Sequence, residues 1–321
     1  MSTVSFNISV QESIKLVEER MRSQASESHP DTRAALEHLL ASGGKRVRPT
    51  VVLLVGNMLG ASQDRLVTLG AAVELLHTAT LVHDDLIDGS LLRRGMPTLN
   101  ARWSPAATVL TGDFLFARAA KLAAETDHLP LMKLFAETLA TIVNGELNQM
   151  FTSRGLISSE NYYDRIYAKT ASLFEMSARA AAMVSPVEEP VVEALRRFGY
   201  ETGMAFQIVD DILDFTGNQT AVGKPLGSDL LQGLVTLPAI YYAEAHPDDP
   251  DVQALAEGGW SNQERMNRLV DSIRDSQAIK QSKREAETFI VRALDQLEPL
   301  PTNTEKTALE DLAKYIIDRK L

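Results

Sequence analysis

Two copies of one acidic pattern, Asp-Asp-x-x-Asp, are the strongest chemical feature of the chain. Positions i and i+4 of a helix lie one turn apart on the same face, so Asp84 pairs with Asp88 and Asp210 pairs with Asp214. Clustered carboxylates repel one another unless a cation lies between them. Mg²⁺ suits such oxygen ligands and takes its remaining ligands from water and substrate phosphates. The two faces, opposed across a cavity, would form a clamp for Mg²⁺ and a diphosphate.

A single pattern of this kind usually marks a solvated acidic helix face, and the second copy with the same spacing argues against that interpretation. Leu81-Val82 precede the first copy and Ile208-Val209 precede the second, so both lie in apolar runs. Aspartate is also a weak helix former, so its repeated use in apolar helices needs a reason. The candidate metal ligands are therefore all six aspartates: Asp84, Asp85, Asp88, Asp210, Asp211 and Asp214.

The composition indicates a globular protein with a large core. The chain has 321 residues, 45% of them hydrophobic and 23% charged. Its formal net charge of −11 argues against a nucleic-acid partner. Cysteine is absent, which excludes disulfides and thiolate metal sites. No uninterrupted apolar run approaches the roughly 18 residues of a membrane span, and residues 1–11 do not resemble a signal peptide. We expect a cytoplasmic protein without a transmembrane segment.

Helical periodicity dominates the chain, and period-2 alternation is almost absent. Ser62 and Ser104-Pro105 have the pattern of helix starts, and Gly60 that of a helix end. Long helices are expected over about residues 106–125, 130–152, 158–183 and 191–215. Residues 216–233 are rich in Gly and polar residues and predict a loop, and about three shorter helices follow residue 250. These features predict one all-α domain over residues 1–321, with about ten to thirteen helices around a central cavity.

Basic residues gather in a few places despite the acidic composition. Lys45, Arg46 and Arg48 follow two glycines, and Arg93-Arg94 follow the first acidic motif. Lys169 lies in an apolar helix, where its ammonium must meet an anion or reach water, and Lys224 lies in the loop after the second motif. Taken singly, each is more often a solubilising surface residue. Together they could hold phosphate groups, arginine by paired contacts and lysine as a point charge.

Two histidines offer further chemistry. His77 lies two helical turns before Asp84 on the same face and could donate to a phosphate oxygen, although a lone helical histidine is more often a core residue. His83-Asp84 raises the alternative of a His-Asp phosphohydrolase. The other histidines lack metal-ligand spacing, so this alternative is weak.

Several stretches together resemble the trans-type isoprenyl diphosphate synthases, also called polyprenyl synthetases. They are GGKRVRP (43–49), ELLHTATLVHDDLIDGSLLRRGMPT (74–98), GELNQ (145–149), KTA (169–171), GMAFQIVDDILDF (203–215) and GKPLGSDL (223–230). The resemblance implies an all-α homodimer that condenses isopentenyl diphosphate with an allylic diphosphate using Mg²⁺.

The resemblance also implies roles for single residues. Asp84, Asp88 and Asp210 would bridge Mg²⁺ to the allylic diphosphate, whereas the other three aspartates would act through water or through neighbouring groups. The implied allylic-diphosphate contacts are Arg93, Lys169 and Lys224. Thr170 and Gln207 would lie beside the developing allylic cation. The implied isopentenyl diphosphate contacts are Lys45, Arg48, His77 and Arg94.

One position departs from the family pattern, and three others bear on product length. Leu234 stands where the family usually has a lysine, which removes a cation near the diphosphate. Ala79 and Thr80 lie roughly 6 to 7.5 Å below Asp84 along the helix, where aromatic residues stop the product short in the family. Their small size predicts a product longer than farnesyl, with geranylgeranyl diphosphate as the alternative. Phe135 is a candidate floor of the tunnel.

Two other functions remain open from the sequence. A terpene cyclase of related fold would also use an acidic Mg²⁺ motif, but it would not need the isopentenyl contacts. A non-catalytic subunit of a hetero-oligomeric synthase would be expected to have lost aspartates from its motifs, and only Leu234 favours that alternative.

Overall fold

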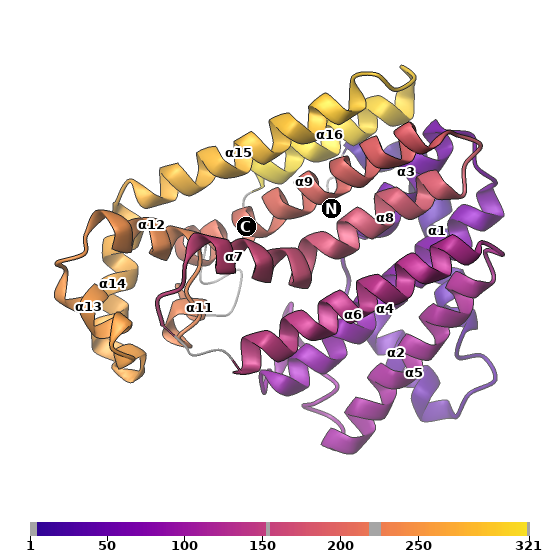
Figure 1. Cartoon of the computed structure of the whole chain (residues 1–321). Helices are drawn as coiled ribbons and strands as arrows, with labels where there is room; N and C mark the ends of the chain where they lie inside the picture. The colour runs from indigo at the N-terminus through magenta and orange to yellow at the C-terminus, as the bar shows by residue number, and fades with distance from the viewer. Residues whose placement is uncertain (1–4, 152–154, 218–225, 320–321) are drawn as a thin grey trace. The chain divides into compact units, whose positions relative to one another are not determined.

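The computed structural model describes residues 5–151, 155–217 and 226–319, with side chains from Ile8 onward (Figure 1). Within these residues the chain is almost entirely helical, with a single two-stranded hairpin. The predicted all-α class is confirmed. Lys224 lies outside the described residues.

The helices and strands follow one another along the chain with these bounds. They are η1 (Ser5–Val10), α1 (Gln11–Ser23), α2 (Pro30–Ala41), α3 (Val47–Met58), α4 (Gln63–Ile87), β1 (Leu92–Arg93), β2 (Met96–Pro97), α5 (Pro105–Ala124), α6 (Leu129–Phe151), α7 (Ser159–Ile166), η2 (Tyr167–Ala171), α8 (Ser172–Met183), α9 (Glu189–Thr216), α11 (Ser228–Leu231), α12 (Leu237–Ala245), α13 (Pro250–Ala256), η3 (Gly259–Ser261), α14 (Gln263–Asp275), α15 (Ala278–Leu297) and α16 (Thr304–Asp318).

The chain divides into two compact units, and several boundaries between them fall inside long helices. Unit 1 comprises residues 1–139, 173–199 and 296–312, and unit 2 comprises residues 140–172, 200–295 and 313–321. The first acidic motif belongs to unit 1 and the second to unit 2. The single domain over residues 1–321, and the opposition of the two motifs across a cavity, therefore stay predictions.

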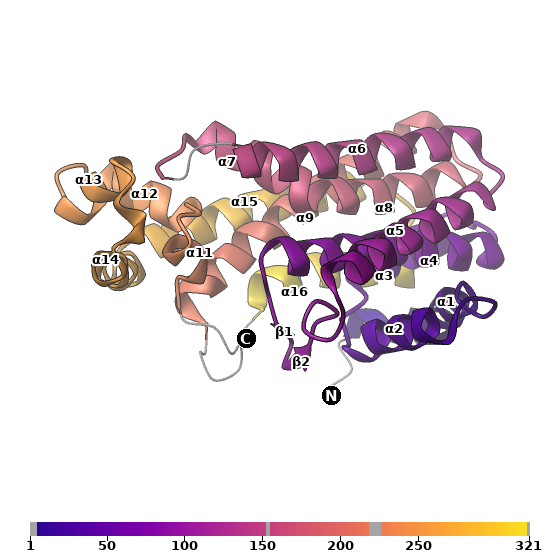
Figure 2. The ribbon, with the colours of Figure 1, turned by 90° about the horizontal axis from the view of Figure 1, so that it is seen from below.

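Helix α4 is the core of unit 1. It packs against α1, α3 and α5, and α2 packs beside α1 (Figure 2). Because α4 is apolar on nearly all sides, it is buried on nearly all sides. By length and composition α4 could cross a membrane, because its few polar residues are spaced along an otherwise apolar helix. However, 78% of its most apolar window is buried inside the protein, as in the core helix of a globular domain.

Unit 2 carries the second acidic motif on the C-terminal part of α9. The helices α11, α12 and α13 and the turn η3 all pack against α14, and α12 also packs against α7 (Figure 1). Phe215, immediately after the acidic motif, is fully buried. The end of α9 is thus anchored in the core of this unit.

Helix starts predicted from Ser-x-x patterns are confirmed. Ser104 is the N-cap of α5, and its hydroxyl accepts from the Ala107 N–H at 3.3 Å. Ser158 caps α7 in the same way, accepting from the Asn161 N–H at 3.2 Å. Each cap lies immediately before the first helical residue, so local chemistry marks where these helices begin.

The helix expected over residues 158–183 is present as α7, the π-helical turn η2 and α8 in direct succession. Two local predictions are wrong. A short helix, α11, lies within the predicted loop of residues 216–233, of which residues 218–225 lie outside the described part of the chain. The C-terminal part contains the long helix α15 rather than only short helices. Among the described residues, the helices slightly exceed the predicted number of about ten to thirteen.

Candidate active site

The first acidic motif occupies the last turn of α4. Asp85 is buried, and its carboxylate accepts from Arg93 Nε at 2.9 and 3.0 Å and pairs with a terminal nitrogen of Arg93 at 2.9 Å. Asp84 is half-buried and Asp88 is exposed, so these two carboxylates, one turn apart, lie on the more open side of the helix end. The middle aspartate orients an arginine, and the outer pair is left on the face that the sequence predicts for a metal.

A tight hairpin returns Arg93 to Asp85. Arg93 pairs with Met96 across β1 and β2, and the two residues between them, Arg94 and Gly95, have φ of +51° and +76°. Positive φ at both central positions is typical of a type I′ turn, where glycine is favoured and arginine is unusual. The hairpin is too short and its turn residues too atypical for the sequence to have revealed it.

The basic residues of unit 1 converge near His77. The Arg48 terminal nitrogen lies 3.1 Å from His77 Nε2, and the Arg48 guanidinium lies 4.8 Å from the ring centroid of Phe174. Lys45 is exposed at the start of the same segment, and Arg94 donates to the Gly43 carbonyl oxygen. The structure therefore brings the predicted isopentenyl diphosphate contacts together around one loop and one face of α4.

The protonation of His77 follows from this geometry. Arginine can only donate, so His77 Nε2 accepts from Arg48 and the ring proton is on Nδ1. Burial, followed by the positive charges of Arg48, Arg94, Arg93 and Arg46, holds the pKa of His77 well below its ordinary value. A neutral His77 that accepts from Arg48 orients that arginine. Its predicted donation to a phosphate oxygen stays a prediction.

The second acidic motif is held by three different partners. Asp210 accepts from the guanidinium of Arg319, which also donates to the Phe206 carbonyl at 3.3 Å and lies 4.0 Å from the Phe206 ring centroid. Asp214 accepts from the hydroxyl of Ser228 at 2.9 Å and from two backbone N–H groups at the start of α11. The motif is thereby connected to the C-terminal segment and to α11.

A chain of hydrogen bonds runs through the middle aspartate of this motif. Thr170 Oγ1 donates to Gln207 Oε1 at 2.6 Å, and Gln207 Nε2 donates to Asp211 Oδ1 at 2.8 Å. The Tyr162 hydroxyl donates to the other Asp211 oxygen at 2.7 Å. Because Thr170 uses its proton for Gln207, its oxygen keeps lone pairs for other groups. These hydrogen bonds therefore orient Thr170 and Gln207, the two side chains that the resemblance places beside an allylic cation.

Asp211 is buried, and its surroundings raise its pKa to about 7. Burial is the largest cause, and the negative charge of Asp229 adds to it. The hydrogen bonds from Gln207 and Tyr162 and the charge of Arg165 act in the opposite direction. Both Asp211 oxygens are occupied by side-chain donors, which favours an orienting role over direct metal ligation.

Lys169 lies on the π-helical turn η2, and its ammonium pairs with a carboxylate, as expected for a lysine in an apolar helix. Its ammonium lies 2.9 Å from the carboxylate of Glu146 in α6. Lys169 and Thr170 both lie on this turn, and π-turns in α-helices occur frequently at functional sites. The extra residue of a π-helical turn rotates the side chains of the following helix relative to those before it. The residue pattern of this segment does not predict the turn.

The residues expected to set product length lie in unit 1. Ala79 is fully buried in α4, and Phe135 of α6 is 3% exposed. Thr80 is half-buried, and its hydroxyl donates to the His77 carbonyl oxygen at 2.8 Å. Their predicted roles in limiting the product stay predictions.

Several residues at these sites were not among the predicted functional residues. They are Glu18, Arg46, Glu74, Glu146, Tyr162, Arg165 and Arg319. Most of them are partners of predicted residues from distant parts of the chain, for example Tyr162 and Asp211. The acidic partners Glu18 and Glu74 look like ordinary helix residues in the sequence. Arg46, Glu74 and Glu146 lie within the quoted stretches 43–49, 74–98 and 145–149, but the resemblance implied no individual role for them.

The remaining surface features lie apart from these residues. His83 contacts α5 through the Val109 carbonyl at 3.1 Å, and it lies 3.5 Å from the carboxylate of Asp113. A surface pocket of about 460 Å³ lies against α5 and the start of α2, and none of the predicted site residues lines it. Neither feature supports the His-Asp phosphohydrolase alternative.

The donors of the two motifs fit a hard divalent cation. In the described residues, no group of three or more His, Asp or Glu side chains forms a ready-made metal cage. However, the motifs offer carboxylate oxygens, and Asp210 already binds a cationic group, the guanidinium of Arg319. Mg²⁺ is usually bound by only a few carboxylates, and water and substrate oxygens complete its coordination.

Comparison with known proteins identifies the family. The polyprenyl synthetase family model matches residues 29–273. The chain belongs to this family. Component 2 of heptaprenyl diphosphate synthase from Geobacillus stearothermophilus is 40% identical over 301 residues, covering 93% of each chain. An all-trans-nonaprenyl-diphosphate synthase from Rhodobacter capsulatus is 39% identical over 288 residues, covering 88% of this chain and 87% of the relative.

A solved structure extends the similarity to three dimensions. A polyprenyl synthase from Caulobacter crescentus CB15, complexed with calcium and isoprenyl diphosphate, has a TM-score of 0.92 and 33% sequence identity. The match covers 99% of this chain and 98% of that one. The predicted family, fold and prenyltransferase class are confirmed, and the relatives support a polyprenyl synthase with a product longer than C15.

Proposed function

We propose that the chain condenses isopentenyl diphosphate with an allylic diphosphate, head to tail, in an Mg²⁺-dependent reaction. The product would be a trans-polyprenyl diphosphate longer than C15. The observation that carries this proposal is a second cluster of cations, in which Arg48 lies 3.1 Å from His77 Nε2 and Arg94 donates to the Gly43 carbonyl beside the exposed Lys45. This charge lies on and beside the helix that ends in the first acidic motif. A terpene cyclase would not need a second anion site of this kind.

Two sets of residues would bind the two substrates. Lys45, Arg48, His77 and Arg94 would hold isopentenyl diphosphate, with the lysine as an exposed point charge and Arg48 oriented by His77. Arg93, Lys169 and Lys224 would hold the allylic diphosphate. Arg93 is oriented for this by its paired contact with Asp85. The present partner of Lys169, Glu146, would have to share that ammonium with the incoming diphosphate.

The metal would act on the leaving group. Asp84, Asp88 and Asp210 would hold Mg²⁺, which supplies neutralisation of the negative charge that develops on the departing diphosphate. The cations of the chain share that task. Thr170 and Gln207, oriented through Asp211 and Tyr162, place oxygen atoms beside the allylic carbon as it becomes cationic. Their fixed orientation avoids reorganisation during the reaction.

The bond-forming step joins the alkene of isopentenyl diphosphate to the allylic cation. A new carbon–carbon bond forms, and a proton is then lost to the released diphosphate. Water must be excluded, because it would quench the cation. The apolar residues that precede each acidic motif, such as Val82 and Ile208, are buried and serve that requirement.

A cytoplasmic homodimer is part of the proposal. An apolar stripe on the unit 2 part of α6 supports the dimer. Val143, Leu147, Met150 and Phe151 are between 43% and 82% exposed and follow the i, i+4, i+7, i+8 spacing of one helical face.

A second candidate is a subunit that requires a different partner chain. The Geobacillus relative is named component 2 of its synthase, and Leu234 replaces the usual lysine of the family. The two candidates differ in whether the chain works alone.

One assay separates these functions. The purified chain is incubated with Mg²⁺, isopentenyl diphosphate and farnesyl diphosphate, and the dephosphorylated products are resolved by chromatography. We expect a discrete prenol longer than C15. Failure with farnesyl, geranyl and dimethylallyl primers would contradict the proposal and favour the partner-dependent subunit.

A further inference from the structure

Arg46 differs from the two other cations of its segment. Lys45 is exposed and Arg48 reaches His77, but the Arg46 side chain is only 10% exposed. Arg46 is also the N-cap of α3 and has φ of +47° and ψ of +38°. A non-glycine residue in this left-handed region is uncommon and persists where its surroundings hold it.

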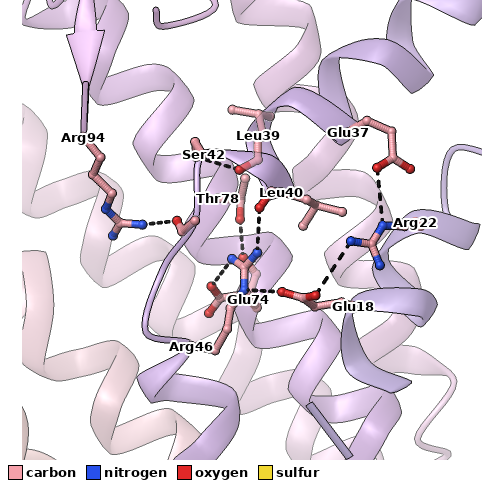
Figure 3. Close-up of polar contacts among 11 residues, drawn as sticks. Glu18, Arg22, Glu37, Leu39, Leu40, Ser42, Arg46, Glu74, Thr78 and Arg94 are labelled. Atoms are coloured by element: carbon pink, nitrogen blue, oxygen red, sulfur yellow. Dashed lines mark hydrogen bonds and ion pairs between the residues drawn. The ribbon is translucent and has the colours of Figure 1, made fainter. Parts of the chain in front are cut away.

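Two carboxylates hold the Arg46 guanidinium (Figure 3). Its Nε donates to Glu18 of α1 at 2.9 Å, and a terminal nitrogen donates to Glu74 of α4 at 2.8 Å. The other terminal nitrogen donates to the Leu40 carbonyl, near the end of α2, at 3.3 Å. One side chain thus joins the start of α3 to three other helices.

The charge of Arg46 is balanced within the protein. Glu74 is 5% exposed, so its carboxylate is a buried partner rather than a solvated one. Burial by itself would lower the pKa of Arg46, but Glu74 and Glu18 outweigh it, and the pKa is raised. A guanidinium shared between two carboxylates offers little net attraction to a diphosphate. Its contribution to binding must therefore come from geometry.

The geometry concerns the loop of residues 43–46. Arg46 fixes the C-terminal end of this loop, and Arg94 donates to the Gly43 carbonyl at the other end (Figure 3). Glu74 lies one helical turn before His77, and its carbonyl accepts from the Thr78 hydroxyl at 2.7 Å. The same ion pair therefore sets the position of the loop relative to the helix that carries His77.

We infer that Arg46 and Glu74 are positioning residues for isopentenyl diphosphate. Their ion pair holds the left-handed turn at residue 46, so that Lys45 on one side and Arg48 on the other converge on one anion. The inference rests on the proposed function, because it names the substrate of that site. Arg46 and Glu74 would not contact the substrate themselves and would act only by positioning Lys45 and Arg48.

The test separates positioning from stability. In the double variant Arg46→Met/Glu74→Met, both buried charges are replaced by apolar side chains of similar length, which frequently preserves stability. We expect a melting temperature close to that of the unmodified chain and a rise of about tenfold in KM for isopentenyl diphosphate. The KM for the allylic diphosphate should change less than about twofold. Arg46→Lys keeps the charge but loses the paired contacts, so its effect on KM should be intermediate.

Arg22 provides a matched control on the same carboxylate. Its guanidinium lies 3.7 Å from Glu18 and 3.3 Å from Glu37, on the side of Glu18 away from the loop (Figure 3). Arg22→Met removes an ion pair with Glu18 without touching Arg46. Both KM values should stay unchanged. A double variant with lowered melting temperature and unchanged isopentenyl KM would show a purely structural role and overturn the inference.

A second readout does not depend on activity. Amide hydrogen exchange of residues 43–48, and calorimetric binding of inorganic diphosphate, should show lost protection and weaker binding in the double variant. If the unmodified chain does not elongate any primer, the proposed function fails, and these two measurements still decide whether the ion pair orders an anion site. Unchanged protection together with unchanged diphosphate binding would contradict it.

Discussion

The guanidinium of Arg319, two residues before the C-terminus, donates to the carboxylate of Asp210 in the second acidic motif. The Arg319 side chain is 7% exposed, whereas Asp210 is 41% exposed. A side-chain cation thus occupies a carboxylate that the proposed function assigns to Mg²⁺. The metal and Arg319 would compete for the same oxygens, because an ionised carboxylate is attracted to both.

Removal of Arg319 should lower the Mg²⁺ requirement. The pair is partly exposed, so its strength is about 1 kcal/mol or less, and Arg319→Ala should reduce the half-saturating Mg²⁺ concentration by up to about fivefold. Arg319→Lys keeps a cation near Asp210 and should give a smaller shift. The measurement is initial rate against Mg²⁺ concentration at saturating substrates. An unchanged or higher requirement in Arg319→Ala would contradict competition at Asp210.

Asp211 should make the chain less stable at alkaline pH. Its pKa is about 7 in the folded state and 3.8 for an ordinary aspartate, so between these pH values the folded state binds more protons. Stability from this group is therefore fully present below about pH 4 and is lost as pH rises through about pH 7. From about pH 6 to pH 8 the expected loss is about 1.4 kcal/mol.

The measurement is the free energy of unfolding in urea across this pH range. Asp211→Asn cannot titrate and accepts or donates hydrogen bonds, so its profile should lack this slope. Equal slopes in the two proteins would assign the pH dependence to other groups.

Features that depend on neighbouring residues were predictable from the sequence. The start of α5 at Ser104-Pro105 and the apolar burial of α4 follow from a cap and from composition. The two acidic motifs were likewise visible, because the i, i+4 relation lies within one helix. These features can be predicted without knowing which elements pack against one another.

The partners of the motif residues were not predictable. Tyr162 and Asp211 are 49 residues apart, and Arg319 and Asp210 are 109 apart, so their hydrogen bonds exist only after packing. Glu74 looks like an ordinary helical glutamate until α3 places Arg46 against it. The π-helical turn that carries Lys169 arises from packing of a segment whose sequence is ordinary for an α-helix.

Replacing Leu234 by lysine, the residue usual in the family, tests how much the site depends on that cation. Its backbone N–H donates to the Asp229 carbonyl at 2.9 Å, and the next carbonyl, that of Val235, accepts from Arg165 at 2.5 Å. Leu234→Lys restores a cation in a half-buried position. We expect KM for the allylic diphosphate to fall severalfold, because an added cation strengthens anion binding. Leu234→Met, which adds no charge, is the control and should leave KM unchanged. Equal values for both variants would show that the lysine is dispensable in this chain.

Ala79 should control product length. It is fully buried on α4, about 7.5 Å from Asp84 along the helix axis. A phenylalanine there would fill space that the growing prenyl chain needs. We expect Ala79→Phe to shorten the product, at a cost of about 1–3 kcal/mol in stability from overpacking.

The smaller change Ala79→Leu should give a product of intermediate length, since the block scales with side-chain volume. Chromatography of the dephosphorylated products measures both lengths, and thermal denaturation shows whether each variant is folded. A folded Ala79→Phe variant that makes the full-length product would place the tunnel elsewhere. In that case Phe135 would be the next position to test. Phe135→Ala leaves a cavity in place of the ring. If Phe135 forms the floor of the product tunnel, this variant should make a longer product.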